Sequence, residues 1–195
     1  MSFTVSLPSS LNPASAAIIR SRASKIGVVF DEIENSVKML LGKPFKFPNG
    51  NTEHTIPAKA ITQLGPGAQL TSLLDQTNNL ACAVACDARF AIVSAGILMM
   101  MGRQVLDERA KEGKVEGLIA ETAREVINVI TGRLAESLRK ATGDPGLQFP
   151  KEEIGGLDKV PRNALLVVTA QANADNMAAG QVQIWFSDAL AAKIK

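Results

Sequence analysis

The chain has 195 residues, 46% of them hydrophobic, with 21 Lys or Arg against 19 Asp or Glu and a formal charge of +2. This length and apolar content predict a single domain with a substantial core over residues 1–195, with a short N-terminal arm. The near balance of charge and the lack of a dense basic run argue against nucleic acid as a partner.

The sequence contains no segment typical of secretion or of a membrane span. Its first residues lack a basic region followed by a continuous apolar run, and the longest apolar run, Ala91 to Met101, is shorter than a span. Cys82 and Cys86 lie too far apart along an expected strand for an ordinary disulfide, and they lack the C-x-x-C spacing of zinc or redox sites. We therefore expect a cytoplasmic protein with no membrane partner and with both thiols packed in its core.

The first half of the chain predicts a long helix followed by strands. Residues 1–11 show no clear period, so they are expected to form an arm or a short strand. Asn12 and Pro13 form a typical helix start, and apolar residues keep a helical spacing up to a stop at Gly42, with Gly27 as a candidate break. Strands separated by turns at 48–50, 65–67 and 75–79 are then expected over 43–47, 54–63, 69–74 and 80–86.

The second half predicts two successive helices and a closing pair of strands. Asp87 is expected to cap a buried helix over 88–101, and the charged segment 103–114 is predicted to be a surface connection. The longest helical pattern, Val115 to Ala141, follows it. Strands are expected over 164–169 and 181–186, joined by the polar segment 171–180 and followed by a short helix within 188–195. Runs of strands between helices, without regular alternation, predict an α+β fold with a mostly antiparallel sheet.

The helix expected over 115–141 carries a polar line opposite its apolar face. At about 100° per residue, this line contains Glu121, Glu125, Asn128 and Gly132. Glu125 and Asn128 lie one turn apart, so they can grip a polar group jointly: the amide can orient a water molecule and the carboxylate can hold a cation. The same spacing is also found among ordinary solvent-facing residues.

The first helix repeats this spacing with Glu32 and Asn35, which also point away from its apolar face. Glu32 belongs to an acidic cluster that a solvated face would equally explain. The single histidine, His54, has no second ligand or nucleophile at a recognisable spacing, so a surface or structural role is expected for it, and no metal site is predicted. The methionines at 99–101 suit packing or an interface, and neither glycine-rich segment matches a phosphate loop.

The line Glu125, Asn128, Gly132 resembles the E-x-x-N-x-x-x-G helix signature of the CheC/CheX/FliY family of chemotaxis phosphatases. The surroundings are similar as well: a first helix ending MLLG at Gly42, an apolar helix ending MMMG at Gly102, a charged linker, the signature helix and two closing strands. The resemblance extends from the first helix to Phe186 and is closest to CheX-like members, which have one signature helix. It implies long helices packed on a mostly antiparallel sheet.

The resemblance also implies an activity, the dephosphorylation of a CheY-like response regulator. In that family the asparagine, here Asn128, orients the attacking water, and the glutamate, here Glu125, holds a lysine of the regulator. The catalytic Mg²⁺ would belong to the regulator, so no cofactor of the chain's own is expected. Gly132 would let the partner backbone approach closely, and Glu121 would lie on the same partner-binding line.

The residues leave three points open. Glu32 and Asn35 form a candidate second site, although Met39 stands where the signature has glycine. A non-catalytic regulator-binding or flagellar-switch-like module of the same fold, and an unrelated α+β binding protein, are the alternatives. Exposed strand edges and the Met-rich helix leave room for a homodimer.

Overall fold

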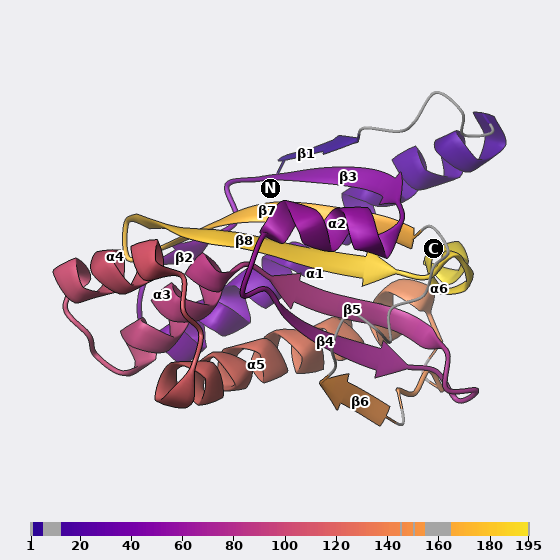
Figure 1. The fold of residues 1–195 in the computed structure, drawn as a ribbon. Coiled ribbons are helices and arrows are strands. Elements are labelled where there is room, and N and C mark those ends of the chain that lie inside the picture. The colour runs from indigo at the N-terminus through magenta and orange to yellow at the C-terminus, as the bar shows by residue number, and fades with distance from the viewer. Residues whose placement is uncertain (1, 6–12, 145, 150, 155–164, 195) are drawn as a thin grey trace.

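The structure is a computed structural model that describes residues 2–5, 13–144, 146–149, 151–154 and 165–194. Its helices are α1 (Pro13–Leu41), α2 (Pro57–Leu64), α3 (Ala88–Leu98), α4 (Arg103–Glu112), α5 (Gly117–Thr142) and α6 (Asp188–Lys193). Its strands are β1 (Ser2–Val5), β2 (Phe45–Lys46), β3 (Asn49–Thr55), β4 (Gln69–Leu74), β5 (Leu80–Cys86), β6 (Lys151–Ile154), β7 (Leu165–Ala174) and β8 (Met177–Phe186). Long helices lie against one sheet, as Figure 1 shows, which confirms the α+β fold expected from the sequence.

The strands form one twisted sheet in the order β1-β3-β7-β8-β5-β4-β6, with β2 paired to β7. Only β1 and β3 run parallel among the described pairings; the others are antiparallel. The centre of the sheet is the β7–β8 hairpin, whose two-residue turn, Asp175 and Asn176, has positive φ at both positions. Such turns match the right-handed twist of paired strands. The sheet is therefore mostly antiparallel, as predicted.

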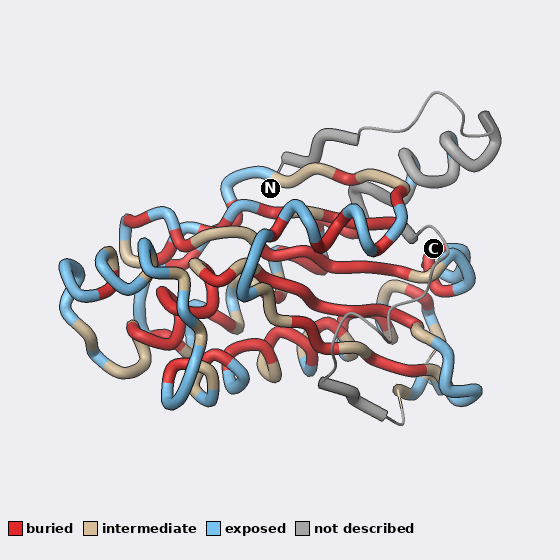
Figure 2. Tube along the Cα trace, in the orientation of Figure 1, coloured by how far each residue is buried: buried red, intermediate tan, exposed pale blue. Residues whose placement is uncertain are grey.

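Side chains alternate between two hydrophobic layers on the two faces of the sheet. On β8, Ile184 and Phe186 belong to the large core that includes the inner faces of α1, α3 and α5, whereas Trp185 packs under α2 on the other face. Figure 2 shows the same arrangement as continuous buried segments along the central strands. The three helices α1, α3 and α5 therefore form one layer, and α5 has an outer surface turned away from the sheet.

Asp87 fixes the start of α3, as its N-cap position predicted. One carboxylate oxygen accepts a hydrogen bond from the Phe90 amide at 2.7 Å, and the other accepts one from the Gln181 amide of β8 at 3.0 Å. Burial raises the pKa of this carboxyl, and the two amides oppose that shift. Gly180, with φ +109°, is required here because a Cβ would lie 2.3 Å from the Asp87 oxygen.

Cys82 and Cys86 are both buried in the core and free, as expected. Burial raises the pKa of both thiols, so they stay protonated and unreactive. The hairpin of β4 and β5, the helix after Asp87, the long helix after Val115 and the terminal helix are likewise confirmed.

Several expected elements are wrong. The segment 54–63, predicted as a strand, ends β3 and then forms α2, with Pro57 in its first turn and its buried residues at helical spacing. The turn expected at 48–50 overlaps the start of β3, and Gly27 does not divide α1. The surface connection expected at 103–114 is the helix α4, whose single buried residue is Leu106. The polar segment 171–180 belongs largely to β7 and β8, because pairing within the sheet extends both strands beyond their apolar parts.

Among the described residues, no helix is both long enough and apolar enough to cross a membrane.

Candidate functional site

Helix α5 carries the candidate site on the side that faces away from the sheet. Its inner residues, such as Val126, Ile130 and Leu134, are fully buried against α1, α3 and the strands. The helix ends at Gly143, which has the left-handed conformation typical of a C-terminal stop, with Arg139 and Lys140 in the last turn. This packing fixes the orientation of the outer residues.

The outer line of α5 contains the four residues that the sequence singled out. Glu121, Glu125 and Gly132 are exposed, and Asn128 is half-buried. Among the described residues, no hydrogen bond or ion pair involves the Glu125 side chain. The Asn128 side-chain oxygen is buried without a hydrogen-bond partner. A Cβ built on Gly132 would meet no atom within 4 Å, so packing within this chain does not require glycine there.

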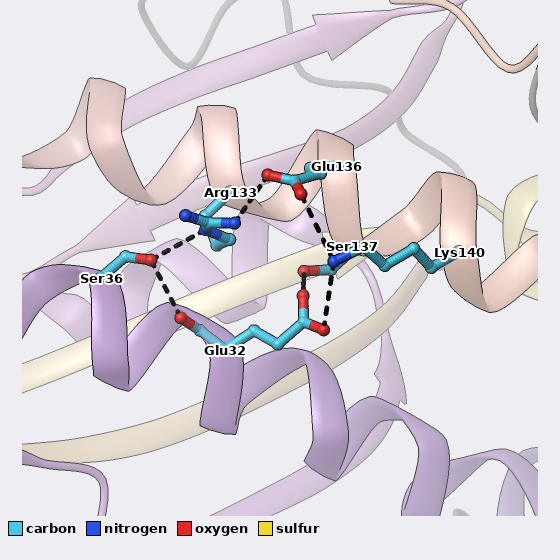
Figure 3. Close-up of polar contacts among 6 residues, drawn as sticks. All are labelled: Glu32, Ser36, Arg133, Glu136, Ser137 and Lys140. Carbon is cyan, nitrogen blue, oxygen red and sulfur yellow. Dashed lines mark hydrogen bonds and ion pairs between the residues drawn. The ribbon is translucent and has the colours of Figure 1, made fainter.

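Glu32 and Asn35 on α1 are held differently, although their spacing in the sequence is the same. The Ser137 hydroxyl of α5 donates a hydrogen bond to a Glu32 carboxylate oxygen, and the Lys140 ammonium lies 3.6 Å from the other oxygen (Figure 3). Asn35 is exposed, and its side chain has no hydrogen-bond partner among the described residues. Glu32 therefore points toward the neighbouring helix rather than into solvent.

The contacts of Glu32 are part of a polar bridge between α1 and α5, which we call the helix clamp: Glu32, Ser36, Arg133, Glu136, Ser137 and Lys140 (Figure 3). Ser36 donates to the Glu32 backbone carbonyl at 3.1 Å and accepts from Arg133 Nε at 2.8 Å. Glu136 pairs with Arg133 at 2.6 Å and with Lys140 at 3.3 Å. Exposed ion pairs contribute about 0–1 kcal/mol each, so the buried Ser137 hydroxyl is the contact with the larger cost of loss.

The helix clamp was not predicted from the sequence, and its residues could not have been paired by spacing. Glu32 and Ser137 are 105 residues apart. The sequence shows that Arg133 and Lys140 lie on α5, but only the packing of two antiparallel helices brings them to Glu32 and Ser36. The clamp distinguishes the two pairs of Glu and Asn. The Glu32 carboxylate binds Ser137 and Lys140, whereas the Glu125 carboxylate has no partner among the described residues.

The remaining candidates do not form a second constellation. His54 lies 3.2 Å from Asp188, at the start of α6, which suits the structural role expected for it. Met100 is 93% exposed and has φ +57°, so it projects from the turn between α3 and α4. Among the residues whose side chains are described, no three His, Cys, Asp or Glu side chains come together as metal ligands would.

The arrangement is that of an α+β domain with three helices on one face of a sheet and an unpaired carboxylate and carboxamide on the outermost line of the last long helix. Solved structures of the proteins FliY and FliM have a similar fold. FliY from Thermotoga maritima matches with a TM-score of 0.61 and 18% identity, covering 95% of this chain and 96% of that chain. The FliM middle domain from H. pylori matches with a TM-score of 0.66 and 9% identity over 91% and 98% of the two chains.

A structure of a FliG–FliM complex from H. pylori also matches, with a TM-score of 0.64 and 8% identity over 93% of this chain and 100% of that chain. No protein-family model and no curated protein sequence matches the chain. At these identities the likeness concerns the fold, and it confirms the CheC/CheX/FliY-like fold that the helix signature implied.

Proposed function

We propose that this chain is a phosphatase that removes the phosphoryl group from a CheY-like response regulator, with the outer line of α5 as the docking and catalytic surface. The observation that carries the proposal is the free Glu125 carboxylate, which lies one turn from Asn128 on an exposed helix face of a FliY-like fold. A surface carboxylate that stays unpaired within the chain can accept a cation from a partner.

The chemistry assigned to these residues is positioning and charge pairing. Water attacks the phosphorus of the regulator's aspartyl phosphate while the bond from phosphorus to the aspartate oxygen breaks, and the water proton leaves with the inorganic phosphate. Asn128 orients the water, and Glu125 pairs with the lysine of the regulator's active site. Neither residue needs to act as a strong base, because phosphoryl transfer depends mainly on alignment and on stabilisation of the transferred charge. The Mg²⁺ that supplies much of that stabilisation is expected on the regulator.

The half-buried state of Asn128 fits this role. Its unpaired side-chain oxygen carries a desolvation cost within the chain. Turning the amide toward solvent would relieve this cost and present both a donor and an acceptor to a water molecule at the interface.

For Glu32 we propose a structural role in the helix clamp rather than a second catalytic site. Its carboxylate already binds Ser137 and Lys140, and Met39 takes the place of the glycine that a partner backbone would need. Asn35→Ala is therefore expected to dephosphorylate the regulator at the wild-type rate.

The alternative is a non-catalytic partner-binding module. FliM has a similar fold and was solved in a complex with FliG, which favours this alternative as a general use of the fold. It predicts regulator binding without faster loss of phosphate.

The experiment is a time course of phosphate loss from a phosphorylated CheY-like regulator, with wild-type protein, Asn128→Ala and Asn35→Ala. We expect wild type to accelerate the loss and Asn128→Ala to remove most of the gain, about 10²-fold, because the water is no longer aligned. Binding of the Asn128→Ala variant to the beryllofluoride-activated regulator should persist. Equal rates for wild type and Asn128→Ala would contradict the catalytic role.

A further inference from the structure

Exposed apolar side chains occur on both α1 and α5, the two long helices joined by the helix clamp. Six large hydrophobic residues are exposed among those whose side chains are described: Val28, Met39, Ile56, Met100, Val105 and Leu118. Three of these residues, Val28, Met39 and Leu118, come from the outer faces of α1 and α5. Val28 lies beside Lys140 and Ala141, at the far end of α5 from Glu125. Single exposed apolar residues need no explanation, but Met39 and Leu118 lie at positions that can extend the Glu125 and Asn128 site.

Leu118 lies on the same line of α5 as Glu125. It precedes Glu125 by seven residues, which at about 100° per residue is two turns less about 20°, or about 10 Å along the helix axis. Leu118 is 62% exposed. It therefore stands on one side of Glu125 along the helix, and Gly132 stands on the other.

Met39 reaches the same region from α1. The helix clamp sets the register of the two antiparallel helices, because Glu32 meets Ser137 and Lys140, and Ser36 meets Arg133. One further turn along α1 therefore brings residues 39 and 40 beside Val129 of α5. Leu40 packs against the core, whereas Met39 is 84% exposed, so this register puts Met39 on the outer side of α1, level with Val129 and about one turn of α5 from Glu125.

We propose that Met39 and Leu118 are docking residues that flank Glu125 and Asn128 and seat the apolar surface around the phosphorylation site of a CheY-like response regulator. This inference rests on the proposed function. The charged side chains on the line itself are Glu121 and Glu125, for which no partner is found among the described residues, so the line combines an apolar residue with negative charge, which complements a partner that presents a lysine among apolar side chains.

The apolar residues have a physical role beyond their own contact area. An ion pair in water is worth little, about 0–1 kcal/mol, because solvent screens it. When Met39 and Leu118 exclude water from around Glu125, the pairing between its carboxylate and the partner's lysine strengthens. The docking residues thus act on binding of the regulator and on the strength of the Glu125 contact, and they do not touch the attacking water.

The test compares Met39→Gln, Leu118→Gln and their double variant with Ile56→Gln, a control at an exposed apolar residue that precedes α2 on the opposite face of the sheet. The double variant is expected to raise both KM for the phosphorylated regulator and Kd for the beryllofluoride-activated regulator about tenfold. Its kcat should be nearly unchanged, and Ile56→Gln should resemble wild type in all three quantities. Helical circular dichroism should be the same for all variants.

The outcomes separate this inference from the proposed function. If wild type accelerates dephosphorylation but the double variant keeps the wild-type KM and Kd, Met39 and Leu118 are not docking residues and the proposed activity stands. If the regulator binds without faster dephosphorylation and the double variant weakens that binding, Met39 and Leu118 are docking residues and the proposed phosphatase activity is wrong. A regulator that neither binds nor loses phosphate faster would overturn both.

Discussion

At the residue scale, two glutamates with the same spacing to an asparagine have different environments. Glu125 is exposed without a partner among the described residues, and Glu32 binds Ser137 and Lys140. The sequence identified both pairs but could not distinguish them, because the residues that bind the Glu32 carboxylate, Ser137 and Lys140, lie about a hundred positions away in the chain. The distinction arises only when α1 and α5 pack side by side.

Gly132 offers a test in which stability and function change in opposite directions. A Gly132→Ala substitution meets no neighbouring atom, so it should raise the free energy of unfolding by about 1 kcal/mol through helix propensity alone. If the regulator's backbone approaches this position, the added methyl group should slow dephosphorylation. Denaturant unfolding and the dephosphorylation rate measure the two effects. A stabilised variant with an unchanged rate would show that Gly132 is not part of the interface with the regulator.

At the scale of elements, the sequence predicted those helices and strands whose own pattern is strong. The helix α5 and the hairpin of β4 and β5 have clear periodicity and clear ends, and they are confirmed. The helix α4 was missed because its surface is almost entirely polar, with Leu106 alone buried. The outer parts of β7 and β8 were missed because their Ala, Gln and Asn residues become strand through pairing with neighbouring strands, which no local pattern reveals.

The packing of α1 against α5 gives a matched pair of substitutions. Glu32→Ala removes the acceptor for the buried Ser137 hydroxyl and should lower the free energy of unfolding by about 1–2 kcal/mol, while keeping most of the dephosphorylation rate. Glu125→Ala removes no side-chain hydrogen bond or ion pair among the described residues, so it should leave stability unchanged and lower the rate. Thermal or denaturant unfolding, together with rates on one regulator preparation, checks both variants. The reverse pattern, an inactive Glu32→Ala and an active Glu125→Ala, would show that the catalytic site lies on α1 and not on α5.

At the scale of the whole molecule, the fold presents α5 to a partner. One sheet supports α1, α3 and α5 on one face (Figure 1), and the buried residues of α5 face that layer, so its line of Glu121, Glu125, Asn128 and Gly132 is directed outward. The sequence predicted the fold class and, through the resemblance, the order of elements. It could not give the register of α1 against α5, because that register depends on contacts such as the hydrogen bond between Glu32 and Ser137, which are 105 residues apart.

The most direct test of this account is a structure of the complex between the chain and a beryllofluoride-activated CheY-like regulator. We expect the outer line of α5 to cover the regulator's phosphorylation site. The Glu125 carboxylate should pair with the regulator's lysine, and the Asn128 amide should lie within hydrogen-bond distance of a water in line with the beryllofluoride group. A regulator bound elsewhere, for example at the exposed Met100 turn, with Glu125 and Asn128 left in solvent, would contradict the account.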